Sequence, residues 1–236
     1  MKLSRALGVA AVGVGATAVV NRTLRKRAGE LDPALPGDQR TYRWRGMDVA
    51  YTEAGSPENP DLVLFHGINA AGSSGEFREI FSELADEYHV VAPDLPGFGR
   101  SDRPPLRYSA ALYEDFVADF LGEFDTPMVV ASSLTSAYVA AVADGTDVSR
   151  LLLVCPTTKA GPEPKQALRE LVRAPLVGDL LFNALTSKPA IRYFNADHGY
   201  YDTASVSDEW TDYEWRTAHQ SNARFAPASF ISGYLN

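Results

Sequence analysis

Residues 94–104 read DLPGFGRSDRP and directly follow a short apolar run, HVVAP, at residues 89–93. Similar apolar runs occur at residues 62–65, 128–132 and 150–156. Nearly every position in these runs is apolar, which is typical of strands buried on both faces of a parallel sheet. Helical patterns separate the runs, and this alternation predicts an α/β fold with a mostly parallel central sheet flanked by helices.

The remaining segments extend this core on both sides. Residues 41–45 and 48–52 alternate around Gly46 and predict a hairpin. The helical patterns between the apolar runs lie at residues 76–87, 112–124 and 134–143.

Residues 157–236 differ from the core because they are rich in aromatic residues and show no clear strand pattern. Helical patterns there lie at residues 164–173, 177–186 and 213–219. We therefore expect three parts: an N-terminal apolar segment and linker (1–39), an α/β core (40–156) and a helical cap (157–236).

A serine follows the apolar run at residues 128–132, directly before a helical pattern. Open α/β sheets bind ligands at the carboxyl ends of their strands, so this position is suited to chemistry. A nucleophile elbow holds its serine on a tight strand-to-helix turn and needs small residues two positions away on either side. Ser133 is flanked by Ala131 and Thr135, whereas the neighbouring registers place Leu134 at one of these positions. Ser133 is the predicted nucleophile; the alternative is an ordinary serine that caps a helix.

The loop HGIN at residues 66–69, the segment DLPGFGRSDRP and the serine elbow occur in that order. Together they resemble the α/β-hydrolase superfamily, in the branch with a helical cap inserted after the sixth strand. The resemblance covers residues 40–236. It implies a Ser133 acyl-enzyme formed from an ester or related acyl bond of a small apolar molecule, without a cofactor.

The resemblance also implies an oxyanion hole made by the backbone N–H groups of Ile68 and Leu134. His66, Gly67 and Asn69 would form the supporting loop. One departure is that the family usually has G-x-S-x-G at the elbow, where this chain has Ala131 and Thr135.

A serine hydroxyl needs a general base, which is itself held by an acid. In the family these two residues follow the seventh and eighth strands, but only six strands are expected here. Residues 155–158 after the sixth strand contain no carboxylate. Residues 151–154 are apolar, and neither charge nor proline protects them as a sheet edge. We therefore expect the acid and the base to lie beyond residue 236, in a chain that is C-terminally incomplete.

Four histidines could be considered as the base. His66 lies in the oxyanion loop, where the resemblance implies a structural role, and His89 begins a strand that should leave it facing solvent. His198 and His219 in the cap could swing over Ser133, although lid histidines are more often structural.

Two alternatives to a serine hydrolase remain. An inactive binding protein, or the product of a truncated gene, would keep the pocket without turnover. A dehalogenase-like relative would need an aspartate at the position of Ser133.

Charge is divided unevenly along the 236 residues, whose net charge is −8. Residues 1–30 hold six basic residues and one acidic residue, and the rest holds sixteen basic and twenty-nine acidic residues. The acidic remainder excludes nucleic acid as a partner. An acidic surface poor in lysine indicates a halophilic source of the haloarchaeal kind. Cys155 is the single cysteine and no histidines pair at i, i+4, so neither a disulfide framework nor a metal site is expected.

Residues 6–20, ALGVAAVGVGATAVV, form an apolar run with basic residues on both sides. The run is shorter than the roughly 20 residues needed to span a bilayer, and the basic cluster after it favours the cytoplasmic side. We expect a cytoplasmic protein or one held at the cytoplasmic face of a membrane through residues 6–20. A signal peptide and a helix that packs on the body are the alternatives.

Overall fold

The computed structural model describes residues 2–236, and it describes their side chains from residue 15 onward with the exception of His198. Its centre is a six-stranded sheet in the order β1-β2-β4-β3-β5-β6. The strands are β1 (Asp38–Trp44), β2 (Met47–Ala54), β3 (Asp61–Phe65), β4 (His89–Pro93), β5 (Met128–Ser132) and β6 (Arg150–Val154). The last four strands pair in parallel, while β1 and β2 form an antiparallel hairpin whose second strand pairs antiparallel with β4. The predicted α/β fold with a mostly parallel sheet is confirmed.

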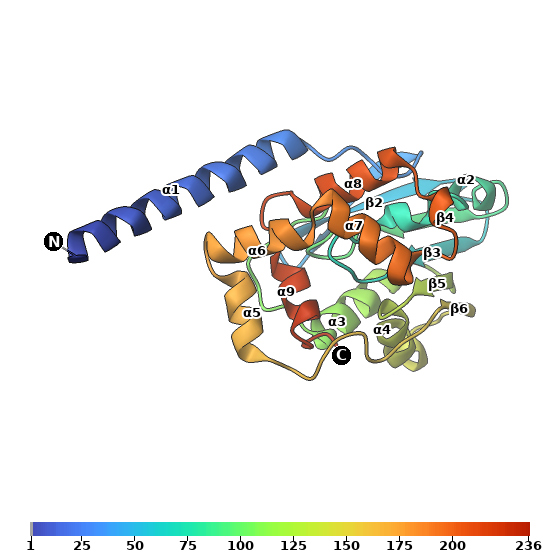
Figure 1. Ribbon diagram of the computed structural model, residues 1–236. Coiled ribbons are helices and arrows are strands. Elements are labelled where there is room, and N and C mark those ends of the chain that lie inside the picture. Colours follow the sequence, from blue (N-terminus) through green and yellow to red (C-terminus); the bar gives the residue numbers. More distant parts are fainter. Residues whose placement is uncertain (1) are drawn as a thin grey trace.

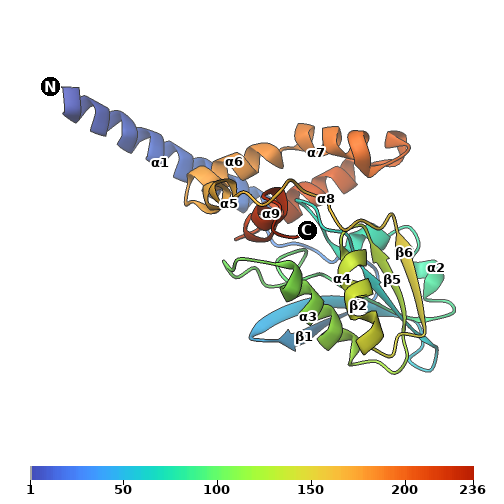
Figure 2. The same ribbon diagram turned by 90° about the horizontal axis from the view of Figure 1, so that it is seen from below.

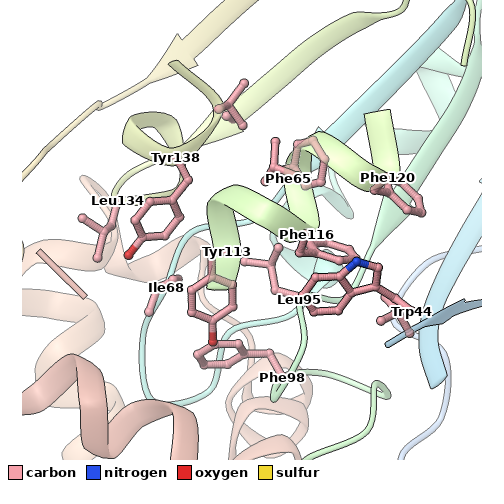
Figure 3. Packing of buried hydrophobic residues seen from close by; sticks show 14 of the residues in the cluster. Trp44, Phe65, Ile68, Leu95, Phe98, Tyr113, Phe116, Phe120, Leu134 and Tyr138 are labelled. Carbon is pink, nitrogen blue, oxygen red and sulfur yellow. The ribbon is translucent and has the colours of Figure 1, made fainter. Parts of the chain in front are cut away.

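Strands β3, β4 and β5 are buried on both faces, which explains why they read as unbroken apolar runs. Val63 and Phe65 of β3 join the larger core cluster, which Figure 3 shows, whereas Leu62 and Leu64 join a second cluster. Alternate residues of a strand point to opposite faces, so one strand supplies both clusters. Helices α3 (Ala110–Leu121) and α4 (Thr135–Val142) pack into the larger cluster, and α2 (Phe81–Leu84) packs into the second.

The predicted helix at residues 76–87 is wrong in extent. A 3-10 turn, η1 (Ser74–Phe77), precedes the single-turn helix α2. The reason is tertiary: the N–H of Ser74 donates to the Asp94 carboxylate at 2.7 Å, and the Glu76 carboxylate accepts from the Gly67 N–H at 2.7 Å. These bonds tie the segment to the loops after β4 and β3, so it does not continue as one regular helix.

The helices after β6 form a group that we call the helical layer (Figure 1). It contains α5 (Gln166–Arg173), α6 (Val177–Leu185), α7 (Lys188–Phe194), the π-helix η3 (Asn195–Gly199), the 3-10 turn η4 (Thr203–Ser205), α8 (Asp208–Ala218) and α9 (Phe225–Ile231). Sequence patterns missed α7 and α9, which are short and contain proline, and placed the start of α8 five residues too late.

The helical layer covers the loops that follow the carboxyl ends of β3 and β4. Ala71, in the loop after β3, packs with Phe182 of α6 and Ala218 of α8. Gly97, in the loop after β4, lies against Ala226 of α9. The loops that the sequence associates with chemistry therefore lie between the sheet and these helices.

Helix α1 (Lys2–Ala28) extends away from the body, and only its C-terminal part reaches the helical layer (Figure 2). Asn21 is buried there, where it donates to the carbonyl of Leu176 and accepts from Asn183 of α6 at 2.8 Å. A short 3-10 turn, η2 (Ala143–Gly145), completes the elements. Within residues 2–236, no helix combines the length and apolarity that crossing a bilayer requires.

Candidate active site

Ser133 lies in a tight turn between β5 and α4. Its φ is +53°, in the left-handed region that residues with a Cβ rarely adopt. The surroundings hold it there: its N–H donates to the Val154 carbonyl of β6 at 2.9 Å, and its carbonyl accepts from the Ser136 N–H at 3.2 Å. Such a strained turn presents the serine at the end of the strand, as an elbow nucleophile requires.

Thr135 occupies the position where a glycine is usual, and it is fully buried. Its hydroxyl donates a 2.7 Å hydrogen bond to the carbonyl oxygen of His66. The buried hydroxyl of Thr135 thus has a hydrogen-bond partner, so its burial is not penalised. The hydrogen bond also links the first turn of α4 to the loop after β3.

His66 is fully buried and joins the loops after β3 and β4. Its Nε2 accepts from the N–H of Leu95 at 3.0 Å, which leaves Nδ1 to carry the proton and donate to the Gly67 carbonyl at 2.7 Å. Both ring nitrogens are engaged, so His66 is a structural residue and cannot accept a proton from Ser133.

Gly67 lies directly against the elbow. A Cβ built on it would lie 3.1 Å from the Cβ of Ser133 and 3.4 Å from the hydroxyl oxygen of Ser132. A side chain at this position would push the serine away, so the close approach of the backbone requires glycine.

Glu76 is a site residue that sequence reasoning missed. Its carboxylate accepts from the Gly67 N–H at 2.7 Å, and its Oε2 lies 3.4 Å from the Cβ position built on Gly67. This places a carboxylate beside the oxyanion loop. The only sequence signal was an acidic residue nine positions after Gly67, at the start of a predicted helix.

Ile68 follows Gly67 and Leu134 follows Ser133, the two residues that approach each other at the elbow. Among the hydrogen bonds of the described residues, neither the N–H of Ile68 nor that of Leu134 is a donor, although both side chains are buried in the larger core (Figure 3). Leu134 precedes the first residue of α4, where the helix dipole favours negative charge. Asn69 stabilises the loop by accepting from the Ala71 N–H at 2.7 Å.

The structure brings no described histidine to Ser133. His219 stacks on Trp215 with ring centroids 4.4 Å apart and donates from Nδ1 to the Trp215 carbonyl, and burial lowers its pKa. His89 is not solvent-facing as expected, because it pairs with Asp61 at 2.7 Å. The side chain of His198 lies outside the described part. Within that part, the Ser133 hydroxyl makes no hydrogen bond.

Helix α8 rests on the segment that carries Glu76. Trp210 of α8 contacts Gly75 of η1, and the Arg78 guanidinium lies 4.0 Å from the Trp210 ring centroid. One turn further along α8, burial raises the pKa of Glu214 to about 7, and its carboxylate accepts from the Asn195 amide at 2.8 Å. Glu214 is therefore a second carboxyl group on the helix that contacts the segment around Glu76, and its pKa is raised.

Comparisons with known proteins agree with this geometry. Over 59 residues the chain is 46% identical to an uncharacterized hydrolase of Saccharomyces cerevisiae, a match that covers 25% of this chain and 20% of the yeast protein. Over 101 residues it is 31% identical to a haloalkane dehalogenase of Bradyrhizobium diazoefficiens, which covers 43% of this chain and 29% of the dehalogenase. These matches span less than a third of either relative.

Among solved structures, a serine hydrolase involved in carbazole degradation (the CarC enzyme) shares the fold. Its TM-score is 0.62 at 19% identity, over 83% of this chain and 69% of that one. The model of one family, described as the alpha/beta hydrolase family, matches residues 62–235. With the serine elbow, the buried loop histidine and the mostly parallel sheet already observed, this chain belongs to the alpha/beta hydrolase family.

Proposed function

We propose that this protein hydrolyses an ester or related acyl bond of a small apolar molecule through an acyl-enzyme on Ser133. The observation that carries the proposal is the strained turn at Ser133, with φ at +53°, facing the backbone of Gly67. Strain of this kind persists where the surrounding structure imposes it, and it concentrates at catalytic positions. A serine that only capped a helix would need no left-handed turn.

In the proposed reaction, the Ser133 hydroxyl oxygen attacks the substrate carbonyl while a general base takes its proton. The N–H groups of Ile68 and Leu134 stabilise the oxyanion, because they carry no other hydrogen bond in the described part of the chain. Collapse of the tetrahedral intermediate breaks the acyl bond, and the leaving alcohol takes the proton. Water then cleaves the acyl-enzyme in the same two steps. The helical layer acts as the cap over this site.

The general base and its acid partner come from polypeptide that pairs along the outer edge of β6. Within the sheet described, β6 is an edge strand, and Leu152 and Val154 are 58% and 42% exposed. Apolar side chains exposed on an edge strand favour pairing with another strand. A strand added there would end next to Ser133, because Ser133 already bonds to Val154 of β6.

A fluorophosphonate probe tests the proposal, because it reacts only with an activated serine. We expect the protein to be labelled at Ser133, as mapped by mass spectrometry of its peptides. Ser133→Ala should abolish labelling, and Ser132→Ala, which alters the neighbouring hydroxyl, should retain it. Hydrolysis of short-chain nitrophenyl esters should follow the same pattern.

One outcome would show that the hydrolase proposal is wrong. A folded gene product that binds an apolar ester but neither reacts with the probe nor hydrolyses the ester would be a binding protein, and the hydrolase proposal would be wrong. The absence of a described base at Ser133 makes this the competing function.

A further inference from the structure

The strongest charge contrast in the molecule lies between α1 and the rest of the chain. Residues 1–30 hold six basic residues and one acidic residue, whereas the remainder is strongly acidic. Arg22, Arg25, Lys26 and Arg27 are all exposed on the last two turns of α1. Any anionic surface would therefore attract this end of the molecule and repel the rest.

Apolar side chains are exposed next to this basic cluster. Val19 and Val20 of α1 are 65% and 46% exposed. The neighbouring helix α6 exposes four further apolar side chains, those of Val177, Leu180, Leu181 and Leu185. Figures 1 and 2 both show α1 projecting beyond α6 with its N-terminal half away from the body. The buried hydrogen bonds of Asn21 to Leu176 and Asn183 hold the two helices together, so the two apolar patches keep a fixed relation.

An open surface pocket of about 460 Å³ lies where α1 meets the N-terminus of α6. Its lining combines small and apolar residues with basic ones: Ala18, Asn21, Arg22, Arg25, Lys26 and Leu176. Arg25 forms an ion pair with Asp179 at 3.6 Å. Arg22 and Lys26 form no ion pair with any described residue. Two positive charges thus face a pocket without a counter-ion from the described chain.

We propose that the surface formed by α1 and α6 docks on an anionic lipid bilayer, with lipid headgroups at Arg22, Arg25 and Lys26 and the exposed apolar side chains in the interface. Basic residues beside exposed aliphatic ones are the pattern of helices that lie in a membrane surface. A symmetric dimer through this surface fits less well, because it would bring two basic clusters together. This inference does not rest on the proposed hydrolysis.

Vesicle co-sedimentation of the full chain tests the proposal, at the lowest salt concentration at which circular dichroism shows the native fold. We expect sedimentation with vesicles of phosphatidylglycerol and phosphatidylcholine, and little with phosphatidylcholine alone. The variant R22Q/K26Q should weaken binding roughly 25-fold, because each basic residue near an anionic surface contributes a factor of about 5. The matched control R43Q/R150Q makes the same charge change on exposed residues of the body and should bind like the unmodified chain.

The apolar part of the surface has its own test. V177S/L180S should weaken vesicle binding while the salt dependence stays unchanged, because it removes apolar area and no charge. Sedimentation that is absent, equal for the two vesicle compositions, or equally weakened by both charge variants would overturn the proposal. Dimerisation that R22Q/K26Q disrupts, without vesicle binding, would assign the surface to a second copy instead.

Discussion

The hydroxyl of Thr135 donates a 2.7 Å hydrogen bond to the carbonyl oxygen of His66, across 69 positions of sequence. One partner begins the helix after the serine elbow and the other begins the loop that carries the Ile68 N–H. Both are fully buried, so the bond is shielded from water. It joins the two backbone segments that would form the oxyanion hole, and it explains how a threonine stands where the family usually has glycine.

Replacing Thr135 with valine should destabilise the protein by about 1–3 kcal/mol, because the buried carbonyl of His66 loses its partner while the volume of the side chain is kept. Thr135→Ser retains the hydroxyl and should cost less. Urea denaturation of the two variants measures the difference. Equal stability of the valine and serine variants would show that the bond has no stabilising role.

Replacing Gly67 with alanine should slow fluorophosphonate labelling of Ser133 by a factor on the order of 10 to 100, since small displacements of reacting groups are costly. The new Cβ would lie 3.1 Å from the Cβ of Ser133. Gly145→Ala is the matched control, because a Cβ there meets nothing within 4 Å. Normal labelling of a folded Gly67→Ala protein would mean that the loop does not position the serine.

Glu214 should make stability depend on pH in a direction unusual for a carboxylate. Burial raises its pKa from 4.5 to about 7, so between these values the native state keeps a proton that the unfolded chain has lost. The free energy of unfolding should therefore fall as pH rises from about 4.5 to 7 and then level off, with a contribution of about 3 kcal/mol at most.

The variant Glu214→Gln should remove this dependence, because its amide stays neutral and can still accept from Asn195. Thermal unfolding of both proteins between pH 4.5 and 8 measures the effect. We expect the glutamine variant to gain stability relative to the unmodified protein as pH rises. Parallel curves for the two proteins would contradict the assignment.

Replacing Gly99 with alanine should prevent stable folding. Its φ is +49°, and a Cβ there would lie 2.1 Å from the Asp94 carboxyl carbon, whose oxygens accept from the N–H groups of Ser74 and Arg100. Gly46→Ala is the control, because it introduces backbone strain without a steric clash. Its φ is +84°, and the space around its Cβ position is open. That control should cost only about 1–3 kcal/mol. Soluble yield and urea denaturation compare the two variants. An equal loss of stability in both would show that the protein accommodates the Cβ at residue 99 without a clash with Asp94.

The core of the fold can be predicted from the sequence because the signals that define it are local. Strands buried on both faces must be apolar at successive positions, so β3, β4 and β5 can be predicted from short windows of sequence. Both β4 and β5 begin and end where the sequence predicts. The turn at Ser133 was also readable, because small residues at fixed spacing leave only one register. The catalytic role of Ser133 and the oxyanion role of Ile68 and Leu134 remain predictions.

The contacts around Ser133 depend on segments far apart in the sequence and could not be predicted from it. Glu76 reaches Gly67 because η1 replaces a predicted helix, and the bonds that cause this come from loops after other strands. Thr135 is accommodated by a carbonyl 69 positions away, and Glu214 has an altered pKa because helices pack over it. Periodicity records which face of an element is buried, whereas hydrogen bonds and desolvation depend on which distant segment covers that face.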